Sequence, residues 1–230
     1  MKFLLLVLIA LLSINVSCKN DFRRLDNYTI KELSFFSQVG FYNHDCLTKW
    51  KDDINIAIKG NPTKRDMEII DTIIKELKPL LGGININRVE SNENFKISFT
   101  EKCPLGNYPY GVVDFKTKFM DWSSFRYIDL WINSNLKGTF REATIKHEFL
   151  HGLGLDHPQS RNTGTLIESN AEYASIDDYE IGMVSLYKFT PLDKACVKIL
   201  YENCLHGGLN RTDFIEYLNV KKENTSHLKK

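Results

Sequence analysis

Apolar residues recur at two spacings along the first half of the chain, and these spacings predict its secondary structure. Isoleucine at every second position after Trp50 predicts a strand, because alternate residues of a strand face the same side. A period of three to four residues follows Thr63, which has capping-box spacing to Asp66, and predicts a helix that ends at Gly82-Gly83. Alternation at four later places predicts four more strands. The apolar positions are Ile54, Ile56 and Ile58 in the first strand, Met67, Ile70, Ile73, Ile74, Leu77 and Leu81 in the helix, and residues 84–86, 95–99, 110–116 and 128–132 in the other strands.

A second helix is predicted over residues 140–152. Thr139 and Glu142 have the T-x-x-E spacing of a capping box, which favours a helix N-terminus there. Gly152 and Gly154 then favour its end, because glycine readily adopts the left-handed conformation that closes a helix. The positions with helical period are Phe140, Ala143, His147, Leu150 and His151.

The two ends of the chain carry weaker patterns. Residues 19–46 have no clear period. An amphipathic helix is predicted after Pro191, then a break at Gly207 and a second short helix around Phe214, and the polar residues 221–230 are predicted to be disordered. The predicted organisation is a signal peptide over residues 1–17, an N-terminal segment over 18–46, a main domain over 47–190 and a helical C-terminal tail over 191–230.

Residues 147–157 read His-Glu-Phe-Leu-His-Gly-Leu-Gly-Leu-Asp-His and fill every fixed position of the zinc motif H-E-x-x-H-x-x-G-x-x-H. Residues four apart on a helix lie on one face, so His147 and His151 can hold the same Zn²⁺ through their imidazole nitrogens. Glu148 is rotated away from them around the helix and flanks the metal, where it can take a proton from a zinc-bound water. The motif therefore predicts a catalytic zinc site with Glu148 as its general base.

The third metal ligand is predicted to be His157. Gly154 must turn the chain after the helix, and this structural turn brings His157 back under the metal. Glu168 and Glu172 stand near the distance at which other HExxH enzymes place a glutamate ligand, but those enzymes continue the helix that glycine interrupts here. Three protein ligands leave a fourth position open for water and substrate, as catalytic zinc sites do.

The string resembles that of the metzincin clan of zinc endopeptidases, in particular matrixins and serralysins. A proline directly after the last histidine, here Pro158, is also found in serralysins. A stretch that opens the last helix of matrixins is similar to Asp177-Asp178-Tyr179-Glu180-Ile181-Gly182. The resemblance implies an α+β fold with an α/β upper lobe: a twisted, mixed five-stranded sheet, two long helices and a small C-terminal lobe. It also implies that residues 110–116 form the antiparallel edge of the sheet over a substrate cleft.

The chain departs from this family at one place. Metzincins carry a methionine turn below the metal, and here Leu166 or Ile167 stands at that position. Met183 is the next methionine and is predicted to be a core residue of a final helix. Because the turn packs an apolar side chain under the site, an aliphatic residue is expected to serve.

The first residues predict export. Lys2 is followed by an unbroken apolar run of ten residues, which fits a secretion signal and is too short to span a bilayer. Two processing routes stay open: Cys18 ends a lipobox and is lipidated, which would attach the chain to a membrane, or an ordinary peptidase cuts after Ser17 or Cys18 and the chain is secreted. The rest of the chain has 29 basic and 29 acidic residues, so its charge gives no indication of nucleic-acid binding.

Four cysteines remain after Cys18. An even number in an exported chain predicts two disulfides. Cys196 and Cys204 are predicted to lie on one helix, too far apart to pair with each other, which favours bonds from the tail back to Cys46 and Cys103.

Two functions follow from these observations. The first is an exported zinc-dependent endopeptidase that acts on peptide or protein substrates. We expect it to be a monomer. The alternative is a zinc-binding surface module that is catalytically weak or inactive and binds a protein partner, as the missing methionine turn and the small C-terminal lobe would allow.

Overall fold

The computed structural model describes residues 22–41, 45–106, 108–159, 163–168 and 187–227. Its centre is a five-stranded mixed sheet in the order β2-β1-β3-β5-β4. Strands β1, β2, β3 and β5 are parallel to one another, and β4 is an edge strand that pairs antiparallel with β5. All five predicted strands are present, and the expected edge strand is confirmed. Their bounds are Ile54–Gly60 (β1), Ile86–Arg88 (β2), Phe95–Thr100 (β3), Gly111–Lys118 (β4) and Asp121–Asn133 (β5).

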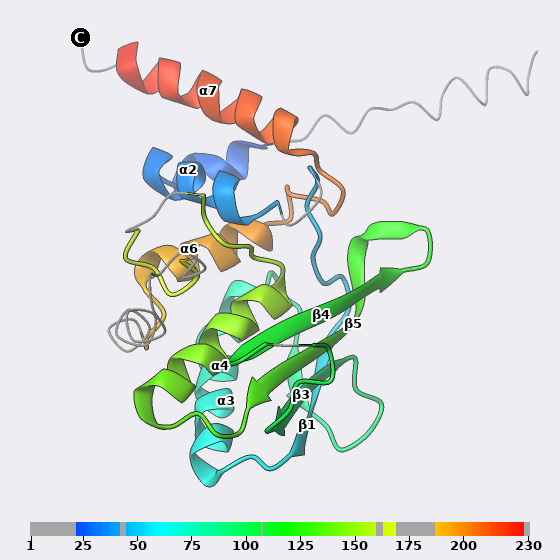
Figure 1. Cartoon of the computed structure of the whole chain (residues 1–230). Coiled ribbons are helices and arrows are strands. Elements are labelled where there is room, and N and C mark those ends of the chain that lie inside the picture. Colours follow the sequence, from blue (N-terminus) through cyan, green and yellow to red (C-terminus); the bar gives the residue numbers. More distant parts are fainter. Residues whose placement is uncertain (1–21, 42–44, 107, 160–162, 169–186, 228–230) are drawn as a thin grey trace, which may run out of the picture.

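Two long helices, α3 (Lys64–Leu77) and α4 (Gly138–Leu153), lie side by side along the sheet (Figure 1). Helix α3 begins at the predicted capping box of Thr63 and Asp66 and continues into the short 3-10 helix η2 (Lys78–Leu80). Helix α4 crosses β3 closely enough that the rings of Phe95 and Phe149 stack with their centroids 5.1 Å apart. The predicted five-stranded mixed sheet is therefore present, and α4 packs against it.

The predicted capping box at Thr139 is wrong. Helix α4 begins at Gly138 with Lys137 as its N-cap, and no side chain caps it. Thr139 thus lies inside the first turn, where its hydroxyl cannot take the capping position. Glu142 forms ion pairs instead, at 2.7 Å with Lys146 and 2.9 Å with Arg65.

A layer of helices from both ends of the chain lies against the end of α4. Helix α2 (Ile30–Val39) packs against α6 (Pro191–Leu200) and α7 (Arg211–His227), and the short 3-10 helix η1 (Phe22–Asn27) precedes it (Figure 1). Phe36 and Phe214 meet in this layer with ring centroids 5.3 Å apart. The sequence pattern missed α2, although Thr29 and Glu32 form a complete capping box at its start.

Two predictions about the C-terminal tail are corrected. Residues 221–227 are helical, because α7 runs to His227 and Lys221 Nζ donates to Leu25 O at 3.0 Å, which ties this turn to the N-terminal segment. Cys204 does not share a helix with Cys196, because α6 ends at Leu200.

The predicted disulfides are absent. All four cysteines in the described part of the chain are free thiols, and Cys196 is fully buried on α6 among apolar side chains. Burial on α6 separates the Cys196 thiol from the other three cysteines, which are partly exposed.

Several predictions lie outside the described residues. These concern the signal peptide, Cys18, Glu172, the stretch 177–182 and Met183. Among the helices that are described, none is long and apolar enough to cross a membrane.

Candidate metal centre

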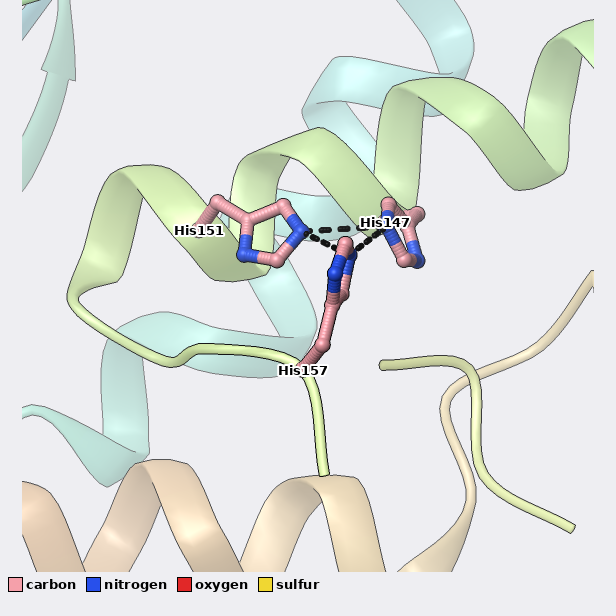
Figure 2. A group of neighbouring side chains, drawn as sticks. All are labelled: His147, His151 and His157. Carbon is pink, nitrogen blue, oxygen red and sulfur yellow. Dashed lines mark hydrogen bonds between the residues drawn. The ribbon is translucent and has the colours of Figure 1, made fainter. Parts of the chain in front are cut away.

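Three histidines converge at the end of helix α4. Figure 2 shows the rings of His147 and His151 projecting from the helix and that of His157 rising from the chain that follows it. Their Nε2 atoms lie 3.0 Å apart between His147 and His151, 3.0 Å between His147 and His157, and 2.8 Å between His151 and His157. The structure thus brings together all three predicted ligand side chains.

Gly154 ends the helix as predicted. Its φ of +106° lies in the left-handed region, and its N–H donates to His151 O at 2.9 Å. A side chain is also excluded there, because a Cβ would lie 2.5 Å from Thr48 O. Glycine is therefore required twice at this turn, by its backbone conformation and by the close approach of another segment.

Gly152, by contrast, does not end the helix. It lies within α4, where a Cβ would meet the ring of Phe95 at 2.5 Å, and its carbonyl accepts a hydrogen bond from Trp50 Nε1 at 2.9 Å. The glycine sets how closely the metal-binding helix approaches the sheet.

The segment that carries His157 is fixed by the N-terminal layer. Asp156 N donates to Val39 O, the last residue of α2, at 2.6 Å, and His157 N donates to the Asp156 carboxylate at 2.7 Å. Leu155 is fully buried beside them. Helix α2 therefore helps to hold the third ligand, a role that nothing in the pattern of residues 19–46 indicated.

The hydrogen bonds of two rings define their protonation. Nδ1 of His147 faces Leu166 O at 2.7 Å, and Nδ1 of His151 faces Leu155 O at 2.7 Å. A carbonyl oxygen only accepts, so each Nδ1 carries the proton and each Nε2 presents a lone pair. The 3.0 Å contact between these two Nε2 atoms therefore has no proton to share and is repulsive unless a cation lies between them.

Burial keeps the rings neutral. It lowers the pKa of His147 to about 3, with a further contribution from His157, and lowers the pKa of His151 well below its ordinary value. Burial also lowers the pKa of His157, which Asp156 partly offsets. Neutral imidazoles are the form that binds a metal ion.

The donor set fits a zinc ion. Two ligands at 2.0–2.1 Å from a tetrahedral metal are separated by roughly 3.3 Å, close to the separations seen here. Two of the imidazoles donate through Nδ1 to a backbone carbonyl, as zinc-binding histidines generally do. Glu168 is not among the converging groups of the described residues, because its carboxylate accepts from Thr163 Oγ1 and Gly164 N instead, each at 3.1 Å.

The position expected for a methionine turn is occupied by two buried aliphatic residues. Leu166 and Ile167 are 1% and 0% exposed, and Leu166 O is the acceptor for His147. Their N–H groups donate to the two carboxylate oxygens of Asp193 at 3.1 and 3.2 Å. Asp193, at the third position of α6, thus links that helix to His147, a predicted metal ligand, through one short loop.

Sequence reasoning missed this use of Asp193. The signal was the spacing of Thr190 and Asp193, which form the capping box of α6. The capping box alone is a sufficient reason for an aspartate at position 193. The hydrogen bonds that Asp193 accepts from Leu166 and Ile167 depend on a contact between distant segments, which the sequence pattern does not indicate.

Glu148 lies on α4 next to the first ligand and is buried, with 8% of its surface exposed. Burial raises the pKa of its carboxyl to about 8 in the absence of a metal ion. Its side chain faces Gly111, the first residue of the edge strand β4. The expected general base is therefore enclosed between the metal-binding helix and the edge of the sheet.

The register of β4 directs part of its backbone toward the open edge. Gly111 pairs with Ile132, and Asn133 N donates to Tyr110 O at 2.8 Å, which makes Gly111–Ile132 a non-hydrogen-bonded pair. The N–H and C=O of Gly111 therefore point away from β5. By the same alternation, those of Val113 also point to the open edge.

Comparison with known proteins gives little beyond this geometry. No protein-family model matches the chain, and no curated protein matches it. Among solved structures, the chain is similar to that of myroilysin, with 13% sequence identity and a TM-score of 0.38 over 68% of this chain and 83% of that one. The likeness is weak, and the metal centre rests on the residues of this chain alone.

Proposed function

We propose that this chain is an exported zinc-dependent endopeptidase. The observation that carries the proposal is the convergence of three neutral imidazoles, two of them with lone pairs directed at each other across 3.0 Å, beside a buried glutamate. His147, His151 and His157 would hold the ion, which supplies Lewis acidity toward a water molecule and a peptide carbonyl when bound. Such a site needs no further protein ligand to act in hydrolysis.

Glu148 would move the proton. Its carboxylate would accept a proton from the attacking water and later deliver it to the amine that leaves. Enclosure between α4 and β4 limits the access of bulk water to this carboxyl, which favours delivery of the proton to the leaving amine.

The edge strand supports a peptide as substrate. An extended peptide can add to a sheet edge through main-chain hydrogen bonds, and the backbone groups of Gly111 and Val113 that face this edge lie on the strand beside Glu148. Binding of this kind depends little on side chains, so we expect broad sequence tolerance.

In the central experiment, a peptide library is incubated with the wild-type protein, the Glu148→Gln variant or the Glu142→Gln variant, and cleavage is measured. Glu142 lies on the same helix, but its carboxylate pairs with Lys146 and Arg65, so its variant serves as the matched control. We expect cleavage by the wild type and by Glu142→Gln, and a loss of at least about 100-fold in Glu148→Gln with zinc retained. A zinc-loaded wild type that cleaves nothing would contradict the proposal and favour the alternative, a zinc-binding surface module.

The metal assignment has its own test. We expect His157→Ala to lose bound zinc on dialysis and Glu168→Ala to keep it, because only His157 faces the other two rings. Zinc retained by the His157 variant and lost by the Glu168 variant would reverse the assignment.

We propose export because the first residues of the sequence have the pattern of a secretion signal. Mass spectrometry of the mature N-terminus would distinguish the two routes. A lipidated Cys18 gives a heavier N-terminal peptide, and ordinary cleavage gives an unmodified one.

A further inference from the structure

The hairpin between β4 and β5 ends in three exposed apolar side chains. Phe119, Met120 and Trp122 are 88%, 84% and 67% exposed, more than any other large apolar residue of the described chain. Figure 1 shows this hairpin extending beyond the helices to the side of the molecule. The metal centre does not involve it, since Glu148 faces Gly111 at the opposite end of β4.

The base of the hairpin holds these side chains in place. Lys51 Nζ pairs with Asp121 at 3.0 Å, Lys118 Nζ pairs with Asp52 at 2.6 Å, and Thr48 Oγ1 donates to Trp122 O at 3.0 Å. The tip is therefore tied at three points to the segment before β1, and its apolar side chains are displayed on an ordered support.

Met120 occupies a turn position that favours other residues. Lys118 pairs with Asp121, so Phe119 and Met120 form the two-residue turn, and Met120 has a φ of +60°. Glycine or asparagine adopts this conformation at lower cost than a side chain such as methionine. The chain thus keeps a large apolar residue where folding alone would favour a small or polar one.

A lipid surface fits this tip better than a protein does. The three side chains expose on the order of 500 Å² together, below the roughly 800 Å² that each partner contributes to a standard protein interface. A convex tip with Trp and Phe can enter the headgroup region of a bilayer without a complementary partner surface. Lys51 and Lys118, at the base of the tip, are both paired with aspartates, so we expect the contact to be mainly apolar.

We propose that the β4–β5 hairpin tip, with Phe119, Met120 and Trp122, inserts into the interface of a lipid bilayer. The contact requires neither zinc nor peptide cleavage, and it does not depend on lipidation of Cys18. Because it is apolar, it takes place on zwitterionic membranes and is little affected by salt.

The three tryptophans allow a direct test. Trp50 and Trp131 are each 1% exposed, so Trp122 is the one tryptophan that a lipid can reach. The full mature chain is mixed with phosphatidylcholine vesicles, with and without brominated acyl chains, at low and high salt. We expect a blue shift of the emission and quenching by the brominated chains, both absent in Trp122→Phe.

Two variants separate insertion from folding. Met120→Asn is expected to raise the melting temperature, because asparagine tolerates the positive φ, and to lower the partition onto vesicles roughly tenfold or more. Phe119→Ser is expected to lower the partition similarly with no loss of folded protein. Tyr108→Ser, which removes a half-exposed aromatic residue elsewhere, is the matched control and should partition as the wild type does.

Three outcomes would overturn the proposal. The first is the absence of Trp122 quenching by brominated lipid. The second is partition that requires anionic phosphatidylglycerol and disappears in high salt, which would assign membrane contact to charge. The third is Trp122-dependent self-association in sedimentation experiments without lipid, which would make a second copy of the chain the partner of the tip.

Discussion

A Cβ atom at Gly111 would lie 2.8 Å from Cγ and 3.0 Å from Oε1 of Glu148. Both distances are shorter than carbon and oxygen atoms approach without repulsion, and the obstacle is the side chain proposed to act as general base. The edge strand therefore leaves room for the Glu148 carboxyl by lacking a side chain at this one position. Gly111 is in this sense a positioning residue, since it acts through Glu148.

We expect Gly111→Ala to displace Glu148 while leaving the metal ligands in place. The φ of Gly111 lies outside the left-handed region, so alanine there would ordinarily stabilise the fold by about 0.4–1 kcal/mol. Because the new Cβ would collide with Glu148, we expect Gly111→Ala to lower the stability of the fold instead, by about 1–3 kcal/mol. Displacement of the carboxyl by about 1 Å should lower kcat/KM by about 100-fold with zinc content unchanged.

A double-mutant cycle separates this contact from a general effect on the strand. In a Glu148→Ala background the obstacle is removed, and Gly111→Ala should be neutral or stabilising in thermal unfolding. The same loss of stability in both backgrounds would show that Gly111 matters to the strand and not to Glu148. This comparison needs no catalytic activity.

Asp193 should control the affinity for zinc from a distance. Asp193→Ala removes the acceptors for Leu166 N and Ile167 N and loosens the loop whose carbonyl orients His147. Loss of a hydrogen-bonded group that orients a metal ligand typically lowers metal affinity by about 10–100-fold. Competition with a chelator of known affinity measures the change.

Thr190→Val provides the control for that experiment. It removes a hydroxyl from the same capping box and should cost about 1 kcal/mol of stability, as cap loss does. Zinc affinity should stay as in the wild type, because Leu166 and Ile167 keep both of their acceptors. Equal zinc affinities of the Asp193 and Thr190 variants would contradict the proposed link.

A buried ion pair joins the two long helices. Arg141 on α4 forms two hydrogen bonds of 2.7 Å to the Asp66 carboxylate at the start of α3, and Asp66 is fully buried. Arg141→Met removes the charged partner of that carboxylate, which keeps its hydrogen bonds from Thr63, and should cost about 3–5 kcal/mol. Denaturant unfolding measures the cost, and Arg65→Met, which removes an exposed arginine of α3, should have little effect.

The convergence of the three histidines could be predicted from the sequence because their geometry is mostly local. His147 and His151 are one helical turn apart, and the turn to His157 follows from a single glycine with a positive φ. Strands β1, β3 and β5 and helix α3 could also be predicted, since each buries apolar residues at a regular spacing. Short-range periodicity contains all of this information.

The supports of the site could not be predicted because they join distant segments. Val39 contacts Asp156 across more than a hundred residues, and Asp193 binds Leu166 across 27 residues. The helix α2 was missed because its apolar residues surround most of the helix, which hides the period. The free cysteines and the uncapped start of α4 likewise depend on packing that no local pattern contains.

The histidine cluster should make the metal-free protein sensitive to acid. Burial lowers the pKa of His147 to about 3 and lowers the pKa of His151 and His157, whereas in the unfolded chain histidine has a pKa of about 6.5. Below pH 6.5 the unfolded chain therefore binds protons that the folded chain excludes. The stability present above this pH is lost as the pH falls toward the folded-state pKa values, by up to about 1.4 kcal/mol per pH unit for each histidine.

Glu148 acts in the opposite direction. Burial raises its folded-state pKa to about 8, so between about pH 4.5 and 8 the folded metal-free protein holds a proton that the unfolded chain has released, and stability falls as the pH rises. The three histidines should outweigh this single carboxyl below pH 6.5. Urea unfolding of the chelated protein between pH 7 and 5 should thus show a net loss of stability on acidification.

Two variants identify the groups responsible. His147→Gln keeps a donor for Leu166 O but cannot titrate, so it should reduce the slope of stability against pH by about one proton. Glu148→Gln should steepen the slope, because it removes the opposing group. A slope that does not respond to His147→Gln would place the acid-sensitive group outside the cluster.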